Sequence, residues 1–168
     1  MDMKSEMVYR YLANDHRRLE ELLRRATIAE GSIEPNAYME FRGGLLRHIG
    51  MEEKILLPAA QTARGGEPLP VASKLRLDHG ALSGLLVLTP TQAIVAAIRS
   101  ILQSHNPLEE GPDGVYSQCE RLDGFDSDQI LVRLQNYPPV AMAAYTDNTT
   151  AIQSARNAIK RAGHDLQF

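Results

Sequence analysis

Residues 41–56 read FRGGLLRHIGMEEKIL, and the spacing of their side chains decides the fold class. One stripe of this stretch, continued by one more turn, consists of Phe41, Leu45, His48, Glu52, Ile55 and Ala59. Each step is three or four residues, so the stripe lies on one face of an amphipathic helix. A helix normally buries that face, yet here it carries a histidine and a glutamate. The pattern therefore predicts a helix that places polar, chemically active groups in the protein core.

Three further stretches repeat this arrangement, each with a histidine in its apolar stripe. Their stripes are Leu12, His16, Leu19 and Leu23; Ala72, Leu75, His79, Leu82 and Leu86; and Ile94, Ile98, Ile101, His105 and Glu109. A single histidine in such a position is usually a hydrogen-bonded core residue. Converging imidazoles from several helices would lack ordinary partners, and an unpaired buried polar group costs about 1–3 kcal/mol. A bound metal resolves this, because neutral imidazole is a common metal ligand.

Chain breakers divide the sequence into long helical pieces. We expect helices at about Met3 to Ala29, Asn36 to Thr62, Val71 to Leu88, and from Thr89-Pro90 to Gly111-Pro112, and no segment reads as a strand. Thr89 is expected to cap the fourth helix. Pro58 is expected to kink the second helix and Pro107 to disturb the fourth. Four helices with short connections predict an all-α fold, an antiparallel up-down four-helix bundle.

The bundle is expected to occupy residues 1–123, and residues 124–168 to form a C-terminal helical extension. A short helical stretch from Val115 to Leu122 ends the bundle. In the extension, helices are expected at Asp126 to Gln135 and at Thr150 to Ala162, the second ended by Gly163. The apolar stripe of the last helix is narrow. The extension is therefore predicted to dock either on the bundle or on a partner subunit, which would make a homodimer.

Composition excludes several classes of protein. The chain has 168 residues, 43% of them hydrophobic and 23% charged, which suits one globular domain. Its net charge is −3 and its basic residues are scattered, so nucleic acid is not an expected partner. The apolar run at residues 85–88 is too short to span a membrane. The N-terminal residues contain no apolar run, so we expect no signal peptide there.

Cys119 is the only cysteine, so no disulfide can form within the chain. This is typical of proteins in a reducing compartment, and we expect a cytoplasmic location. Cys119 is expected to act as a small apolar residue near the end of the bundle, with a redox thiol as the alternative.

Two glutamates strengthen the case for a metal. Glu52 follows His48 by four residues, and Glu109 follows His105 by four residues. This spacing places each pair on adjacent turns of one helix face, where both side chains can bind one ion. A buried carboxylate is costly unless it pairs with a cation. Pro107 lies in the turn that separates Glu109 from its histidine.

Two other residues are interpreted as lying outside the site. Glu20 also follows His16 by four residues, but Arg24 lies one turn further on, so Glu20 is expected to form a surface ion pair. His164 follows the expected helix end at Gly163 and lies in no apolar stripe. It is expected to be an ordinary surface or terminal histidine outside the site.

The candidate ligands are too numerous for one tetrahedral zinc ion, which takes four. They suit two ions of higher coordination number that share the carboxylates. The residues concerned are His16, His48, Glu52, His79, His105 and Glu109. The sequence lacks the Glu-x-x-His pair of ferritin-type di-iron sites and the His-Glu-x-x-His motif of zinc proteases.

At these residues the sequence resembles the hemerythrin-like family, also called the HHE cation-binding domain. The matching elements are Asn14-Asp15-His16-Arg17, His48-Ile49-Gly50-Met51-Glu52-Glu53, Asp78-His79 and His105-Asn106-Pro107-Leu108-Glu109-Glu110. The resemblance covers roughly Val8 to Leu122. It implies a non-haem di-iron centre with a bridging oxygen, although other divalent metals are alternatives. By resemblance Glu52 and Glu109 would be the bridging carboxylates, and the histidines of the four helices would be terminal ligands.

One departure from the family concerns the third helix. Oxygen-carrying hemerythrins have five histidine ligands, two of them four residues apart on that helix. Here Leu75 and Ser83 occupy the positions on either side of His79. The fifth ligand is therefore missing unless another residue supplies it, which argues against a simple reversible oxygen carrier.

The sequence leaves several functions open. The first is a protein that binds or senses oxygen, nitric oxide or peroxide. The second is a redox enzyme that removes peroxide or nitric oxide, with Tyr9 as a candidate proton donor or else a tyrosine at the edge of the core. Iron handling or storage ranks last of the three, because no acidic cluster suggests a surface for mineral nucleation. A metal-free scaffold is a further alternative, disfavoured because it would leave buried polar groups unsatisfied.

Overall fold

The computed structural model describes residues 6–168, and within that range the chain is helical without any strand. Residues 3–5 of the expected first helix lie outside this range. The elements are α1 (Met7–Ala26), α2 (Pro35–Met51), η1 (Glu52–Leu56), α3 (Leu57–Ala63), α4 (Ala72–Val87), α5 (Gln92–Glu110), α6 (Val115–Glu120), α7 (Ser127–Gln135) and α8 (Thr149–Arg161). These bounds lie within a few residues of the expected ones. Gly163 has a positive φ of 83°, as expected of a residue that ends a helix.

The start of α5 differs from the expectation. Its N-cap is Thr91, whose hydroxyl accepts a hydrogen bond from the backbone N–H of Ile94 at 3.2 Å. Thr89 binds the C-terminal extension instead, because its N–H and its hydroxyl both donate to the Asp147 carboxylate, at 2.9 and 2.7 Å. The helix therefore begins after Thr91, the nearer of two competent capping residues.

The two internal prolines lie in different local structures. At Pro58 the disturbance of the helix takes the form of the π-helical turn η1, in which the Leu57 N–H bonds to the Glu52 carbonyl. Pro58 has no N–H, and its ring would clash with the carbonyl four residues before it, so the wider turn accommodates it. In α5 the helix continues through Pro107 to Glu110.

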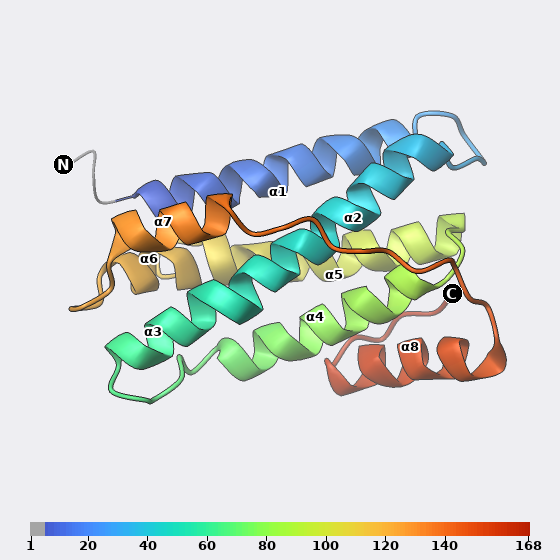
Figure 1. The fold of residues 1–168 in the computed structure, drawn as a ribbon. Coiled ribbons are helices and arrows are strands. Elements are labelled where there is room, and N and C mark those ends of the chain that lie inside the picture. The colour runs from blue at the N-terminus through green and yellow to red at the C-terminus, as the bar shows by residue number, and fades with distance from the viewer. Residues whose placement is uncertain (1–5) are drawn as a thin grey trace.

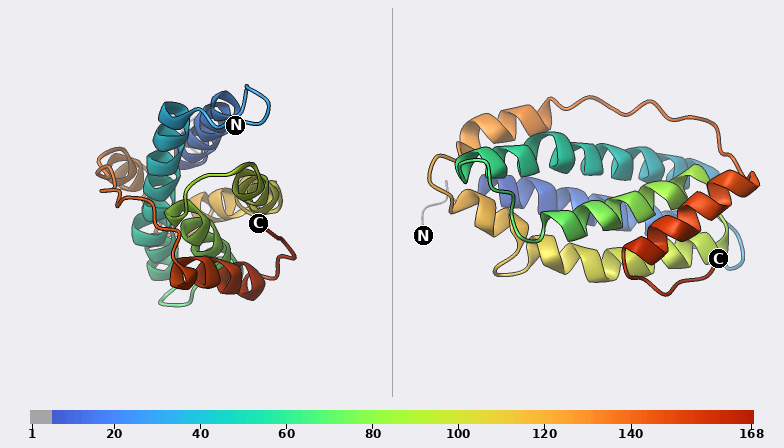
Figure 2. Two further views of the ribbon diagram at one scale, coloured as in Figure 1. Left: turned by 90° about the vertical axis from the view of Figure 1, so that its right-hand side faces the viewer. Right: turned by 90° about the horizontal axis from the view of Figure 1, so that it is seen from below.

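The four long segments α1, α2–η1–α3, α4 and α5 lie lengthwise beside one another and give the molecule its elongated shape (Figures 1 and 2). Contacts join α1 to α2, α2 to α4, α4 to α5 and α5 back to α1, so the segments enclose a common interior. At the α1–α2 contact a side chain on Gly44 would lie 2.7 Å from Leu19 Cδ2, so glycine permits this close approach.

The interior consists of two apolar clusters with a polar layer between them. One cluster joins the C-terminal halves of α1 and α4 to α2, to the N-terminal half of α5 and to α8. The other joins the N-terminal halves of α1 and α4 to η1, α3, α6 and α7. Between them lie the histidines and glutamates of the stripes, which are buried. A polar layer of this kind must satisfy itself, because the clusters exclude water on both sides.

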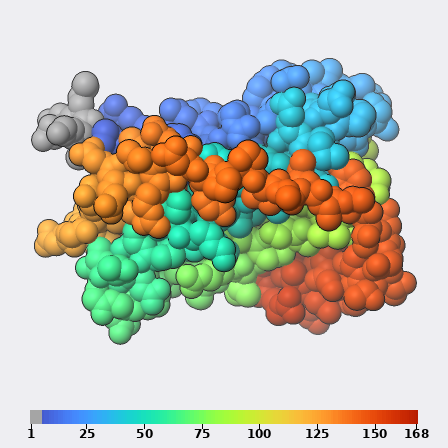
Figure 3. All heavy atoms as spheres, viewed as in Figure 1, coloured from blue at the N-terminus to red at the C-terminus, as the bar shows by residue number. Residues whose placement is uncertain are grey.

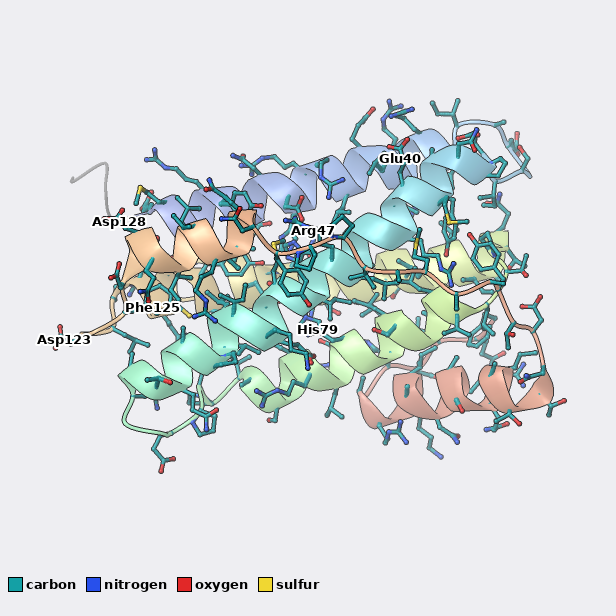
Figure 4. The ribbon with its side chains drawn as sticks, in the orientation of Figure 1. Glu40, Arg47, His79, Asp123, Phe125 and Asp128 are labelled. Atoms are coloured by element: carbon teal, nitrogen blue, oxygen red, sulfur yellow. The ribbon has the colours of Figure 1, made fainter. Side chains whose placement is uncertain are left out.

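The C-terminal extension packs on helices of its own chain. Helix α7 contacts α1 and η1, and α8 contacts α4. The segment between them runs along α2, as the views from the front and from below both show, and covers part of that face (Figures 1 to 3). Arg47, labelled in Figure 4, donates to the Tyr137 carbonyl at 2.9 Å. Buried Arg42 donates to the Ala143 carbonyl at 2.9 Å, so two arginines of α2 hold the segment.

Helix α8 approaches α4 closely at one point. A Cβ on Gly84 would lie 3.2 Å from the Ala155 Cα, so the absence of a side chain allows the two backbones to come together. None of the helices in residues 6–168 has both the length and the apolar character needed to cross a membrane.

Candidate metal centre

The structure brings the candidate ligands of all four long segments together in the polar layer. All six side chains are buried, and Glu109 is completely inaccessible to solvent. His79 lies between α4 and the α2–η1 segment (Figure 4). The imidazoles form two pairs, with ring centroids 4.4 Å apart for His16 and His48 and 4.9 Å apart for His79 and His105.

Each glutamate directs its two oxygens to different histidine pairs. Glu52 Oε1 lies 3.3 Å from His48 Nε2, while its Oε2 lies 3.1 Å from His79 Nε2. Glu109 Oε2 lies 3.3 Å from His16 Nε2, while its Oε1 lies 2.9 Å from the Nε2 atom of His105.

The donors thus form two groups, which we call site A (His16 and His48) and site B (His79 and His105), and both glutamates belong to each. Within each group the ligand atoms all lie within 4.8 Å of one another. This is the arrangement that two ions bridged by two carboxylates would need.

Several inward-facing atoms have no hydrogen-bond partner. They are Glu52 Oε2, His79 Nε2 and Glu109 Oε1. The first two are 3.1 Å apart, yet their geometry is not that of a hydrogen bond, so they converge on a common point rather than on each other. Buried polar atoms are rarely left unpaired, and a cation between them would satisfy all three. The donor set therefore fits a metal.

Comparisons with protein-family models, with curated proteins and with solved structures find no match for this chain.

A second set of carboxylates surrounds the histidines. Each Nδ1 atom is paired with an acidic side chain from a different helical segment, while each Nε2 faces the interior. The pairs are His16 with Glu110, His48 with Asp15, His79 with Glu53 and His105 with Asp78. These contacts form a closed ring around the bundle. A carboxylate of α1 binds the histidine of α2, and a carboxylate of η1, which continues α2, binds the histidine of α4. In the same way α4 binds the histidine of α5, and α5 binds the histidine of α1. A histidine that donates its Nδ1–H in this way presents the Nε2 lone pair to a metal and is a stronger ligand.

Sequence reasoning missed these outer carboxylates, although a signal was present. Every one of them is the immediate neighbour of a candidate ligand, as in Asp15-His16 and Glu52-Glu53. Neighbouring residues on a helix are rotated by about 100°, so the neighbour of an inward-facing ligand lies at the boundary with the next helix. An acid at that boundary can reach the histidine of the adjacent segment.

In the absence of a cation, this surrounding negative charge keeps the histidines protonated. Burial alone would lower the pKa of His48, but the charge of Glu52 outweighs it and raises that pKa to about 10. Burial is likewise outweighed at His105, where Glu109 raises the pKa to about 9, and at His79, where the surrounding glutamates raise the pKa to about 12. A metal must therefore displace protons from these rings.

Tyr116 is a member of the site that the sequence did not reveal. It lies on α6, is completely buried, and directs its hydroxyl into site A. The hydroxyl donates to Glu52 Oε1 at 2.6 Å and lies 3.2 Å from the Nε2 atoms of His16 and His48. Burial and the two glutamates hold the pKa of Tyr116 well above its usual value, so without a metal it is a neutral phenol.

Of the two residues expected to lie outside the site, Glu20 does so and His164 does not. Glu20 is exposed as expected, but Arg24 pairs with Glu21 at 2.7 Å instead. The expectation for His164 was wrong, because its side chain is only 13% exposed and its Nε2 lies 2.7 Å from Asp78 Oδ1. The other oxygen of Asp78 binds His105, so the C-terminal extension reaches the layer behind the ligands.

The candidate proton donor Tyr9 and the candidate redox thiol Cys119 both have structural roles. Tyr9 donates its hydroxyl to the Glu110 carbonyl at 2.9 Å and packs edge-on against Tyr116, so it supports the site from outside. Cys119 is buried, and burial raises its thiol pKa to about 12, as expected of a small apolar residue rather than a redox thiol.

A pocket connects the solvent to the metal-binding layer. It has a volume of about 420 Å³ and lies between α1 and α5, with His16 in its wall. Leu19, Leu23 and Leu102 supply apolar lining, while Arg99 contributes a charged side chain. The pocket gives small molecules a route to the edge of site A.

Proposed function

We propose that this chain is a hemerythrin-like protein: an antiparallel up-down four-helix bundle that holds two iron ions between its helices. The observation that carries the proposal is the division of each glutamate between two histidine pairs. Glu52 and Glu109 would bridge the ions, and the imidazoles would be terminal ligands. The successive reversal of the long segments along the molecule in Figure 1 supports the bundle topology.

The donor set is one that suits iron. It contains imidazole nitrogens and carboxylate oxygens without a thiolate, and paired sites of this composition in helical bundles suit iron or manganese. When bound, iron would supply one-electron redox chemistry and coordination positions for a small exogenous ligand. The protein's own contribution is to orient the imidazoles through the outer carboxylates and to exclude bulk water with the two apolar clusters.

We infer that the physiological ligand is small, such as oxygen, nitric oxide or peroxide, and that the protein binds or senses it. The pocket beside His16 supports access from solvent, and the burial of the remaining ligands supports a protected centre. A redox enzyme is the second candidate. The pocket volume of about 420 Å³ exceeds what a diatomic ligand needs, so it leaves room for a larger substrate.

Metal analysis tests the proposal directly. The protein should be reconstituted with ferrous iron under anaerobic conditions, desalted and analysed for metal. We expect close to two iron ions per chain, and the matched variant Glu20→Ala, on the solvent side of α1, should bind the same amount. A plateau at one iron per chain, or binding of zinc without iron, would overturn the di-iron proposal.

A further inference from the structure

Tyr116 makes more polar contacts than a phenol can satisfy. Its hydroxyl lies 2.6 Å from Glu52 Oε1 and 3.2 Å from Glu109 Oε2, His16 Nε2 and His48 Nε2. A hydroxyl donates one proton and accepts at two lone pairs, so it can satisfy at most three of these contacts. Its proton goes to Glu52 Oε1 and the ring N–H groups can fill its lone pairs, which leaves Glu109 Oε2 facing the phenol oxygen with no proton between them.

The spacing of these atoms is that of donors around one ion. Donors bound at about 2.1 Å and at right angles to one another are about 3.0 Å apart. The Tyr116 oxygen stands at 2.6 to 3.2 Å from all four donors of site A. It has no hydrogen bond to His79 or His105, so it belongs to site A alone.

We infer that Tyr116 is a fifth protein ligand, binding the metal of site A through its phenolate oxygen. This inference rests on the proposed di-iron function and deepens it. On binding, the phenol O–H bond is replaced by an oxygen–metal bond, the proton passes to solvent, and no group changes oxidation state. A bound metal ion lowers the pKa of the oxygen donor that it holds, which favours this exchange.

The chain is built to bring this side chain back to the centre. Helix α5 ends at Glu110, and a tight turn at residues 111–114 leads into α6. The Gly114 N–H donates to the Gly111 carbonyl at 2.8 Å, and a Cβ on Gly114 would lie 2.4 Å from the Glu109 carbonyl oxygen. Only glycine permits this turn, which folds α6 against α1 and α5 and so places Tyr116 beside Glu109.

With Tyr116 as a ligand, the two metal positions differ in their number of protein donors. Site A has five protein donors with Tyr116, and site B has four. The fifth histidine that the third helix lacks would have joined His79 in site B. The fifth protein ligand is instead Tyr116, which comes from α6 and belongs to site A.

Resonance Raman spectroscopy of the iron-loaded, oxidised protein tests the inference. A ferric phenolate gives a visible charge-transfer band, and excitation in that band enhances the ring vibrations of the bound tyrosine. We expect both signals in the natural protein. We expect Tyr116→Phe to lose them and to bind its second iron at least about tenfold more weakly. Tyr9→Phe is the matched control, because its ring contacts Tyr116 but its hydroxyl bonds outside the site, and it should keep both signals.

The outcomes separate this inference from the proposed function. Two bound irons without phenolate vibrations, or vibrations that persist in Tyr116→Phe, overturn the tyrosine ligand and leave the di-iron proposal standing. Failure to bind two irons overturns both. Should Tyr116→Phe not fold, phenylalanine variants of the other five tyrosines assign the signal by elimination, and its loss in any one of them excludes Tyr116.

Discussion

Glu52 and His48 lie one helical turn apart but relate differently to the two sites. Glu52 contributes an oxygen to each site, whereas His48 faces site A alone. We therefore expect Glu52→Ala to release both irons and His48→Ala to retain about one per chain, because the donors of site B remain intact. Metal analysis after desalting distinguishes them. Equal loss in both variants would mean that the two ions bind only as a unit.

The residues of this site differ in how far the sequence could predict them. The burial of the six candidate ligands could be predicted, because each lies three or four positions after another member of its stripe, on a helix whose phase that stripe fixes. Tyr116 could not, because the turn at residues 111–114 separates α6 from α5 and erases the phase between them. His164 was misread for a related reason, since nothing in the local pattern shows that a chain end folds back on Asp78.

Asp78 shows how a residue outside the site can tune it. Its Oδ2 lies 3.1 Å from His105 Nδ1, while its Oδ1 accepts from Lys74 at 2.6 Å and lies 2.7 Å from the His164 ring. We expect Asp78→Asn to weaken iron binding by about 10–100-fold, the range usual for partners of metal-bound histidines. His164→Ala should weaken it by less, because Lys74 still holds the carboxylate.

Competition with a chelator of known affinity would measure both variants of this pair. Iron binding that is unchanged in Asp78→Asn would show that the outer carboxylates do not influence the ligands. If His164→Ala weakened iron binding more than Asp78→Asn did, the C-terminal extension would influence the site through a contact other than the one with Asp78.

At the scale of elements, the sequence predicted each helix but not how the pieces join. Apolar periodicity located the segments well, whereas the π-helical turn before Pro58 and the cap at Thr91 depend on local competition between bonds. The docking of the extension was left open for a physical reason. A narrow apolar stripe fits any complementary surface, and the close approach of α8 to α4 depends on a glycine, whose apolar partners the local pattern does not show.

The contact between α4 and α8 gives a test of that docking. Gly84→Val should reduce the free energy of unfolding by about 1–3 kcal/mol, because its branched side chain meets the Ala155 backbone. Gly80→Ala on the same helix is the control. Nothing lies within 4 Å of its Cβ, so it should stabilise the helix by about 0.5–1 kcal/mol. Urea unfolding measures both, and equal changes in the two variants would mean that α8 does not pack there.

At the scale of the whole molecule, the polar layer makes stability depend on both metal and pH. In the metal-free protein the pKa values of His105 and His48 are raised to about 9 and about 10, from an ordinary value of 6.5. A raised pKa means that the folded protein holds its proton more tightly than the unfolded chain. The resulting stabilisation is complete below pH 6.5 and is lost as the pH rises towards 9 and 10. The pKa of Glu52 is lowered to about 2, so its contribution stays constant over this window.

The metal-loaded protein should show the opposite trend, because a metal competes with protons for the same nitrogen atoms. Raising the pH removes the competing protons and strengthens metal binding, and metal that binds only the folded state adds its binding free energy to stability. We therefore expect the melting temperature of the metal-free protein to fall between pH 6.5 and 9, while its difference from that of the iron-loaded protein widens. Thermal unfolding of both forms across this range measures the trend. Because the two forms are compared at the same pH, the effect of surface charge on the melting temperature is common to both. A metal-free protein that becomes more stable as the pH rises would mean that the histidines are neutral in the fold, and that the surrounding carboxylates act only through hydrogen bonds.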